Sequence, residues 1–573
     1  MQYPTLLEYM KAIQDAGNNL DKLSHLSVVL DGHGEPYHIS GDSSVVFKMQ
    51  DKTTGKCYAL KCFTKAQKGC ADASSNSSSM KYLEKELLVL SQGKEEKYPV
   101  ELMDWLDDDS LGASQLKVED MSTEATKAEL NEAITDEFSV KYSKDGRKLL
   151  KVPQKLKGTY AIKEGTKIIC DRAFEDCKSL RSLVIPNSVT SIRESAFSFC
   201  SSLKSIVLPD GITSIGDETF FGCSSLASLV IPDGVTSIGN GAFAYCGSLK
   251  NLVLPESVVS IKGNLFCKWN GEVKCLSPNF IFEDGVLFNK GKSTIISFRD
   301  KDITSYVIPD YVTSIGGDAF SGCESLTSLV IPDSVVSIGD GAFSHCESLK
   351  NIVLPNSITS IGFCVFQHCR SLKSLVIPDS VTSIDTLAFC FCSSLKSLVI
   401  PDGVTSIGSG AFSGCESLKS IVIPDSVTCI GNRAFEYCFS LKSLVLSKSL
   451  TSIGDWAFNM AESLESLVIP DSVTSIGDYA FSGCRSLKSL VISNSVTHIA
   501  MGAFLSCTSL SSVVIPDGVT SIGEGAFIGC ESLKSIVLPD GVVSIEKDAF
   551  RDCNFPNDFK QKLISRFGDK IFG

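Results

Sequence analysis

Features that mark several common protein classes are scarce or missing in this sequence of 573 residues. Basic residues are in the minority, with 53 Lys and Arg against 66 Asp and Glu and a net charge of −13. Nucleic-acid binding depends on basic surfaces, so this balance disfavours a nucleic-acid partner. No apolar run approaches the roughly 18 residues that a membrane-spanning helix requires. We therefore predict neither nucleic-acid binding nor a membrane span.

Signal-peptide features and catalytic motifs are missing as well. The first residues, MQYPTLLEYMKAIQDAGNNL, place Glu8 and Asp15 among the apolar positions, and no basic start precedes an apolar core. This pattern predicts a cytoplasmic protein, or a cell-surface protein if the natural N-terminus was trimmed. The six histidines are scattered without a Ser-His-Asp or Cys-His arrangement, and His345, His368 and His498 occupy surface-like positions. We predict no enzyme activity and no cofactor.

Cysteine, by contrast, is abundant, and its spacing shows how the chain is organised. Paired CxxC spacing is absent, so we predict no metal site. One thiol at the same place in each repeated unit indicates a buried packing column, because free cysteine behaves as a small apolar residue. Stacked parallel side chains fit disulfide geometry poorly, which predicts reduced thiols. Fourteen of the 23 cysteines recur on a lattice of 23 residues: Cys177, Cys200, Cys223, Cys246, Cys323, Cys346, Cys369, Cys392, Cys415, Cys438, Cys484, Cys507, Cys530 and Cys553.

Phenylalanine and proline recur in step with the cysteines. Sixteen phenylalanines, from Phe174 to Phe550, form one column. The segment SLKSLVIP alternates and is rich in β-branched residues, which predicts a strand ended by proline, and VTSIG predicts a second short strand. A single 23-residue unit cannot cover its own apolar side, so the units must stack. The expected fold is a β-rich solenoid with parallel sheets.

The repeated pattern L-x-x-L-x-I-P…V-x-x-I…A-F-x-x-C resembles the Treponema-type, or BspA-like, leucine-rich repeat. The resemblance covers residues 160 to 553 and rests on several columns that agree over many copies. It implies a curved solenoid of bacterial type that binds proteins. It names no ligand.

The ends of the array and one interruption depart from the lattice. FSVKYSKDGRKLLKVP and FIFEDGVLFNKGKSTIISF each predict a β-hairpin, with turns at Asp145-Gly146 and Asp284-Gly285, and look related to each other. NFPNDFKQKLISRFGDKIFG predicts a terminal helix capped by Asn557 or Asp558. The expected parts are a linker at 121–137, a capping hairpin at 138–160, a solenoid at 161–553 interrupted by a hairpin at about 262–303, and a capping helix at 554–573.

Residues 1–120 do not follow the lattice. GDSSVVFKMQDKTTGKCYALKCFTK resembles the glycine-rich loop and the second and third strands of a protein kinase N-lobe. The resemblance implies a small α+β domain in which Lys61 contacts nucleotide phosphates, Gly41 belongs to the loop and Val46 follows it. MKYLEKELLVLS is either the helix that carries the partner of this lysine, Glu86, or the fourth strand.

Departures from the kinase pattern favour a non-catalytic domain. Two of the three loop glycines are replaced, by Ile39 and Ser44. No H-R-D loop or D-F-G follows, although phosphoryl transfer requires an aspartate and ligands for magnesium. We therefore predict a folded spacer or docking domain, with nucleotide binding as the alternative.

Candidate contact residues lie in the surface columns, because the inward columns are used for packing. The third position of SLKSLVIP is usually basic, as in Lys373, Lys396 and Lys419, and the position after proline is usually acidic. Either these charges bind an extended partner or they only keep the repeats in solution. The aromatic departures Trp269, Phe439 and Trp456 either contact a partner or fill gaps in packing.

The sequence as a whole favours an interaction or scaffold protein of the cytoplasm. The alternative is a cell-surface adhesin that binds proteins of a host or a neighbouring cell. The plain Ser and Val positions of the sheet face disfavour a small-molecule ligand and favour broad contact with a protein.

Overall fold

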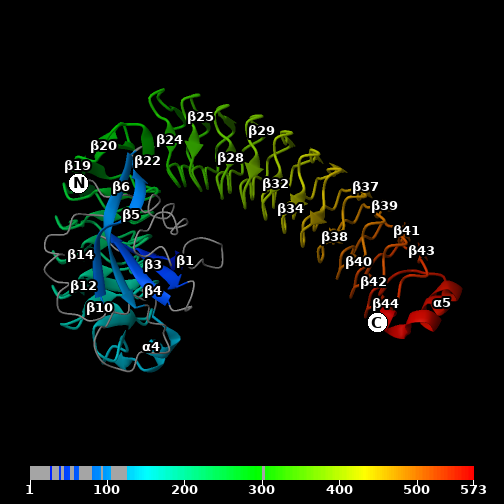
Figure 1. Cartoon of the computed structure of the whole chain (residues 1–573), viewed down its shortest axis with the longest axis horizontal. Helices are drawn as coiled ribbons and strands as arrows, with labels where there is room; N and C mark the ends of the chain where they lie inside the picture. The colour runs from blue at the N-terminus through cyan, green and yellow to red at the C-terminus, as the bar shows by residue number, and fades with distance from the viewer. Residues whose placement is uncertain are drawn as a thin grey trace. The chain divides into compact units, whose positions relative to one another are not determined.

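The computed structural model describes residues 125–299 and 303–573, together with the backbone of six strands nearer the N-terminus (Figure 1). The chain divides into two compact units, Met1–Met121 and Ser122–Gly573. No helix of the described residues is long and apolar enough to cross a bilayer.

The first unit holds one antiparallel sheet, in the order β1-β3-β4-β6-β5 with β2 also paired to β3. The expected pair of strands around Lys61 is present as β3 and β4. MKYLEKELLVLS forms a strand, β5, so the helical alternative for Glu86 is wrong; its pairing with β6 shifts between Leu83 and Leu87. The strands are β1 Leu26–Val28, β2 His38–Ser40, β3 Ser44–Asp51, β4 Cys57–Phe63, β5 Met80–Ser91 and β6 Lys94–Asp104.

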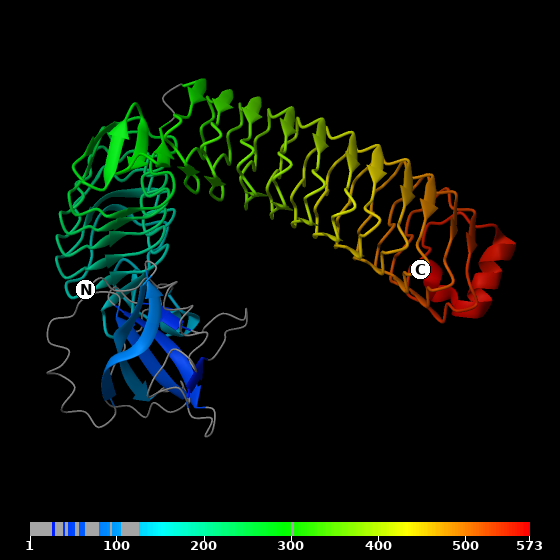
Figure 2. The same ribbon diagram turned by 45° about the horizontal axis from the view of Figure 1, so that its top comes forward.

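The second unit is a solenoid of 23-residue rungs, most of which carry two short strands that pair in parallel with the same strands of a neighbouring rung (Figure 2). Ser374 pairs with Ser397, for example, and Ser383 with Ser406. The β-solenoid predicted from the spacing is confirmed. The strands from SLV-type segments are β10 Lys157–Ala161, β12 Ser179–Val184, β14 Ser205–Ile206, β17 Asn251–Leu254, β19 Glu272–Cys275, β23 Ser305–Val307, β25 Ser328–Val330, β27 Asn351–Val353, β29 Ser374–Val376, β31 Ser397–Val399, β33 Ser420–Val422, β35 Ser443–Val445, β37 Ser466–Val468, β39 Ser489–Val491, β41 Ser512–Val514 and β43 Ser535–Val537.

The strands from TSIG-type segments form a second set. They are β11 Ile168–Ile169, β13 Ser191–Ile192, β15 Ser214–Ile215, β16 Ser237–Ile238, β18 Ser260–Ile261, β24 Ser314–Ile315, β26 Ser337–Ile338, β28 Ser360–Ile361, β30 Ser383–Ile384, β32 Ser406–Ile407, β34 Cys429–Ile430, β36 Ser452–Ile453, β38 Ser475–Ile476, β40 His498–Ile499, β42 Ser521–Ile522 and β44 Ser544–Ile545.

The phenylalanine and cysteine columns hold the turns between these strands. Neighbouring rings stack, as between Phe389 and Phe412, whose centroids are 5.3 Å apart. The carbonyl of Phe366 accepts two hydrogen bonds, from the backbone N–H of Cys369 at 3.1 Å and from the thiol of Cys392 in the next rung at 3.2 Å. The same thiol contact repeats along the column. Cysteine therefore suits this position because it is small and apolar yet satisfies the second lone pair of a buried carbonyl.

The mid-chain insertion separates two hydrophobic cores. Strand β21 (Val286–Asn289) pairs with β20 (Phe280–Glu283) and β22 (Thr294–Phe298), and β22 then pairs in parallel with β24. Leu287 belongs to the core on the N-terminal side, whereas Val286 and Phe288 belong to the core on the C-terminal side. Successive side chains of β21 point to opposite faces, so this one strand contributes residues to both cores. We call the rungs before this hairpin the first array and those after it the second array.

The first array also begins with antiparallel strands. The Asp-Gly turns of the two hairpins, however, join different strands. Strand β8 (Lys141–Tyr142) pairs with β7 (Ile134–Thr135) and with β9 (Lys148–Lys151), which continues in parallel into β11. Asp145-Gly146 lies between β8 and β9 and so corresponds to the turn between β21 and β22. Asp284-Gly285 joins β20 to β21, one strand earlier. The two dipeptides are therefore not equivalent.

Short helices lie at both ends of the second unit. Helix α4 (Lys127–Asn131) carries a capping box of Thr126 and Glu129, and Glu129 also pairs with Lys148 at 2.9 Å. At the other end, α5 (Asn557–Phe567) begins after Pro556, so neither Asn557 nor Asp558 is its N-cap. The 3-10 helix η2 (Asp569–Phe572) supplies carbonyls to the last rung, where the Phe550 N–H donates to Ile571 at 2.8 Å.

Candidate functional site

A column of exposed valines runs along the SLV-type strands of the second array. In β29, Ser374 and Val376 point outward and Leu375 is buried between them. The exposed fraction of these valines in the second array ranges from 46% at Val330 to 81% at Val376. We call this set the valine column; in the second array it consists of Val307, Val330, Val353, Val376, Val399, Val422, Val445, Val468, Val491, Val514 and Val537.

Charged residues border the valine column on both sides along the strand direction. Lys373, Lys396 and Lys419 are exposed at the start of successive strands, and the Lys396 N–H donates to the Lys373 carbonyl at 3.1 Å. We call this basic set the lysine column. Asp379 and Asp402 are exposed after the prolines that end the strands. An apolar stripe is thus bordered by one basic and one acidic edge.

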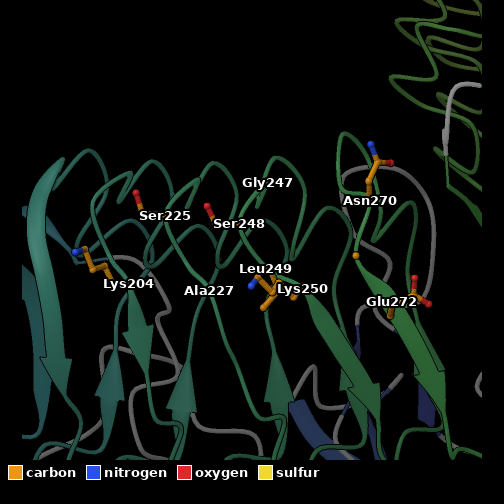
Figure 3. Close-up of a pocket in the computed structure, with 10 residues that line it drawn as sticks. Lys204, Ser225, Ala227, Gly247, Ser248, Leu249, Lys250, Asn270 and Glu272 are labelled. Atoms are coloured by element: carbon orange, nitrogen blue, oxygen red, sulfur yellow. The ribbon is translucent and has the colours of Figure 1, made fainter.

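The equivalent positions of the first array, Lys204, Ala227 and Lys250, border a hollow of about 640 Å³ (Figure 3). Ala227 stands where neighbouring rungs carry Lys204 and Lys250, and these two lysines lie on either side of it in Figure 3. Ser225 and Ser248 contribute hydroxyl groups to the lining. The short side chain of Ala227 leaves room for the hollow, and its lining combines the basic Lys204 and Lys250 with the acidic Glu272.

The three aromatic residues that depart from the repeat pattern lie in different environments. Trp269 is 1% exposed, and its indole Nε1 donates to the Leu249 carbonyl at 2.6 Å, so it fills a gap in packing and is not a surface contact. Trp456 is half-buried and stacks on Tyr479 with ring centroids 4.2 Å apart. Phe439 is half-buried beside Tyr437, at 5.9 Å. Trp456 and Phe439 therefore stay candidates, and Trp269 does not.

The residues predicted to bind nucleotide are only partly described. Gly41 lies outside the described residues. Val46 and Lys61 face each other across β3 and β4, and Glu101 of β6 is the other neighbour of Lys61. Glu86 lies within β5 at the irregular part of its pairing. The described backbone thus pairs Lys61 with Val46 and Glu101 and places Glu86 in a strand.

Burial shifts the pKa of several cysteine and histidine side chains of the solenoid towards the uncharged form. Burial raises the pKa of the Cys246 and Cys507 thiols to about 12, which removes their nucleophilic thiolate at neutral pH. His345 and His368 stack at 4.5 Å, and burial lowers the pKa of both imidazoles. Among residues 125–299 and 303–573, no three His, Cys, Asp or Glu side chains are grouped to hold a metal ion.

The repeat columns agree with a known family model. The model described as the BspA type leucine rich repeat region (6 copies) matches four stretches of the chain, residues 158–271, 295–415, 382–510 and 451–573. The chain belongs to the BspA-type leucine-rich repeat family. No curated protein matches this BspA-type chain.

Several solved structures are similar to this BspA-type protein. A leucine rich cell surface protein from Faecalibacterium prausnitzii A2-165 is 32% identical, with a TM-score of 0.39, over 51% of this chain and 73% of that chain. A leucine-rich repeat protein from Bacteroides ovatus is 26% identical, with a TM-score of 0.37, over 77% and 96% of the two chains. One from Eubacterium ventriosum is 26% identical, with a TM-score of 0.41, over 57% and 90%.

Sequence reasoning missed the aromatic residues two positions after the column phenylalanines. Phe199, Tyr245, Phe391 and Tyr437 are each exposed by about two fifths. Glycine is frequent at this position of the BspA-type unit, as at Gly414, so the large residues there could have been recognised as departures in the sequence.

Proposed function

We propose that this BspA-type protein is a non-catalytic protein-binding solenoid whose contact surface is the valine column with its charged borders. The observation that carries this proposal is the unbroken run of exposed valines from Val307 to Val537. An exposed apolar stripe of this length is unusual on a surface that only keeps a protein in solution. The charged columns on either side would orient the partner and exclude proteins of the wrong charge.

The partner that suits this surface is an extended protein segment. Rungs repeat at about 4.8 Å, and the valine side chains are small, so the face offers many equal contacts and no deep specific pocket. An extended chain, or a second repetitive protein, can match that period over several rungs. Affinity would then come from the sum of modest contacts.

Affinity capture from cells of the source organism tests the proposal. Two variants alter the surface: a triple Lys373→Glu, Lys396→Glu, Lys419→Glu exchange, and a triple Val376→Glu, Val399→Glu, Val422→Glu exchange. The matched control reverses three exposed lysines outside the lysine column, at Lys144, Lys547 and Lys562. We expect a protein that the wild type and the control retain and both surface variants lose. A partner retained equally by all four chains would refute the proposed surface.

The setting is either a cytoplasmic scaffold or a cell-surface adhesin. Abundant thiols would indicate the cytoplasm if export led to their oxidation. Most thiols of the cysteine column, however, are buried and donate hydrogen bonds to carbonyls. Such thiols resist oxidation in either compartment. Fractionation together with protease treatment of intact cells decides between the settings: protection from protease supports the scaffold, and cleavage supports the adhesin.

Nucleotide binding by the first unit is a separate alternative with its own test. With the glutamate of the kinase pattern placed in a strand, we expect no thermal shift on adding ATP and magnesium to the full chain. A shift that Lys61→Ala abolishes would contradict this expectation.

A further inference from the structure

The two kinds of sheet begin differently at the start of the first array. The sheet of TSIG-type strands continues past β11 into β9, β8 and β7, so the hairpin covers its first edge. The sheet of SLV-type strands begins at β10, which pairs only with β12. Figure 1 shows β10 as the outermost of the strands β10, β12 and β14. Among the strands that the structure describes, nothing pairs with the outer edge of β10.

The backbone direction shows which groups lie on this outer edge. Successive residues of a strand direct their N–H and C=O groups to opposite sides. The N–H of Ile162 donates to the carbonyl of Val184 in the next rung at 3.0 Å, so Ile162 and Tyr160 direct their backbone groups towards β12. Thr159 and Ala161 direct theirs away from it. In the described part of the chain, no hydrogen bond reaches these outward N–H and C=O groups, which form a short open edge.

The side chains around the edge are accessible. Lys157, Thr159 and Ala161 are all exposed. A Cβ atom at Gly158 would meet no other atom within 4 Å, so the space beside the strand is open. Phe138 is 49% exposed and packs against the buried ring of Tyr160, with centroids 5.6 Å apart. A strand added at this edge would therefore meet solvent on one face and an apolar ring on the other.

The surroundings of β10 are basic, although the chain as a whole has a net charge of −13. Residues 138–167 contain nine lysines and arginines, and their acidic residues are Asp145 and Glu164. Other basic side chains nearby are paired, such as Lys148 with Glu129. Three exposed side chains at or beside β10 have no ion pair with any described residue: Lys155, Lys157 and Arg181. The open edge therefore lies in a region of uncompensated positive charge.

This charge selects among the strands that could pair with β10. Lysines and bulges on an edge keep proteins from pairing with the wrong strand, and β10 has Lys157 and a register shift between Gly158 and Thr159. Two copies of β10 paired antiparallel about Thr159 would bring the lysines of both copies together, which destabilises the pair. An acidic strand meets no such repulsion. The bulge precedes Thr159, so the outward groups of Thr159 and Ala161 keep regular strand spacing.

We propose that β10 binds an extended acidic segment of a protein partner as an added strand. The backbone of the segment hydrogen-bonds to Thr159 and Ala161, and its acidic side chains pair with Lys157 and Arg181 on the exposed face. Residues between the acidic ones face Phe138 and are apolar. In this mode of recognition, main-chain hydrogen bonds give affinity and alternate side chains give specificity. The inference rests on the proposed protein-binding function and adds a second contact point, at the start of the first array.

Fluorescence anisotropy on the full chain tests the proposal, with a fluorescein-labelled peptide of sequence Glu-Val-Glu-Val-Glu as the probe. One control peptide is Lys-Val-Lys-Val-Lys. The other is the acidic peptide with every amide nitrogen methylated, which keeps the charge but cannot donate backbone hydrogen bonds. We expect saturable binding of the acidic probe, weaker at higher salt because the charges are exposed, and no binding of either control.

A proline exchange tests the backbone contact. Ala161→Pro removes an outward N–H and leaves the hydrogen bonds to β12 in place, because proline is tolerated on an edge strand where its nitrogen faces outward. It should weaken probe binding about tenfold, through the lost hydrogen bond and the bulk of the ring. Val307→Pro is the matched control, since Val307 has the corresponding place in β23, the first SLV-type strand of the second array. It should leave probe binding unchanged.

A charge exchange keeps the test decisive if Ala161→Pro does not fold. The triple exchange Lys155→Glu, Lys157→Glu, Arg181→Glu changes exposed side chains only. It should abolish binding of the acidic probe and create binding of Lys-Val-Lys-Val-Lys. Wild-type affinity for the acidic probe in this variant, or equal binding of the methylated peptide by the wild type, would overturn the proposal.

The test also separates this proposal from the proposed function and from self-association. The triple exchange of Lys373, Lys396 and Lys419 should leave probe binding as in the wild type, and loss of binding there would assign the peptide to the lysine column and overturn the proposal. Failure of the probe to bind the wild type would remove the strand site and leave the capture experiment on the valine column unaffected. A dimer that Ala161→Pro dissociates in sedimentation would assign the edge to a second copy of this chain and overturn the assignment to a partner.

Discussion

Replacement of Asn264 by alanine is the sharpest test of how the two arrays are joined. Asn264 is buried, and its Nδ2 donates to the carbonyls of Phe298 at 3.3 Å and Ser321 at 3.1 Å. Its Oδ1 accepts from the Ser297 hydroxyl at 2.5 Å and from the Phe266 N–H at 2.9 Å. One side chain thus connects the last rung of the first array to the start of the second.

The expected loss follows from these hydrogen bonds. Asn264→Ala removes three contacts across the junction, each worth about 1 kcal/mol net, and leaves the buried Ser297 hydroxyl without its partner. We expect the coupling between the arrays to weaken by about 3 kcal/mol, which corresponds to roughly a hundredfold change in an equilibrium constant. In a solenoid each rung depends on its neighbours, so the effect should stay near the junction.

Hydrogen exchange measured by mass spectrometry locates the effect. Amides of β16, β18, β24 and β26 should exchange about a hundredfold faster in Asn264→Ala, while amides of β36 and β38 keep their wild-type rates. Asn432→Ala is the matched control, because Asn432 is exposed and accepts one hydrogen bond, from the Asp455 N–H at 2.9 Å. Unchanged exchange at the junction, or an equal increase in every rung, would refute the reasoning.

Three further predictions concern the core columns and the junction. Phe435→Ala should lower the free energy of unfolding in urea by about 3 to 5 kcal/mol, whereas the exposed Phe363 should tolerate alanine within about 0.5 kcal/mol; similar losses would contradict the ring stack. Ellman's reagent should label the buried cysteine column only after unfolding, because burial raises the pKa of thiols such as Cys246; rapid labelling of the native column would contradict its burial. Desolvation raises the pKa of Asp318, so its ionisation opposes folding at neutral pH, and this penalty disappears as pH falls through the raised pKa towards the usual value. Asp318→Asn should therefore raise the melting temperature at pH 7 but not at pH 3, and an equal change at both pH values would count against this cause.

The solenoid could be predicted because its signal repeats. Each column, such as the phenylalanines from Phe174 to Phe550, gives the same indication many times, and the stacking requirement then leaves few alternatives. The role of Trp269 could not be predicted, since an aromatic residue in a cysteine column fits either a packed or an exposed position until the neighbouring carbonyl of Leu249 is located.

Local sequence was less informative where tertiary contacts decide the outcome. MKYLEKELLVLS has residues that favour a helix, yet it pairs as a long strand with β6. Asp145-Gly146 and Asp284-Gly285 look alike because both suit tight turns, although they join different strands.

The repeat sets the distances along each of the two arrays in steps of one rung. Within an array, each rung contacts only the rung before and the rung after it, through bonds such as that from the Cys392 thiol to the Phe366 carbonyl. Removing or adding one 23-residue unit between the junction and Gly414 therefore needs no new contacts. It would move Gly414 by one step of about 4.8 Å relative to Asn264. Adding or removing whole units within an array changes distances between features in such steps, so a partner that contacts two features would discriminate between chains that differ by a single unit.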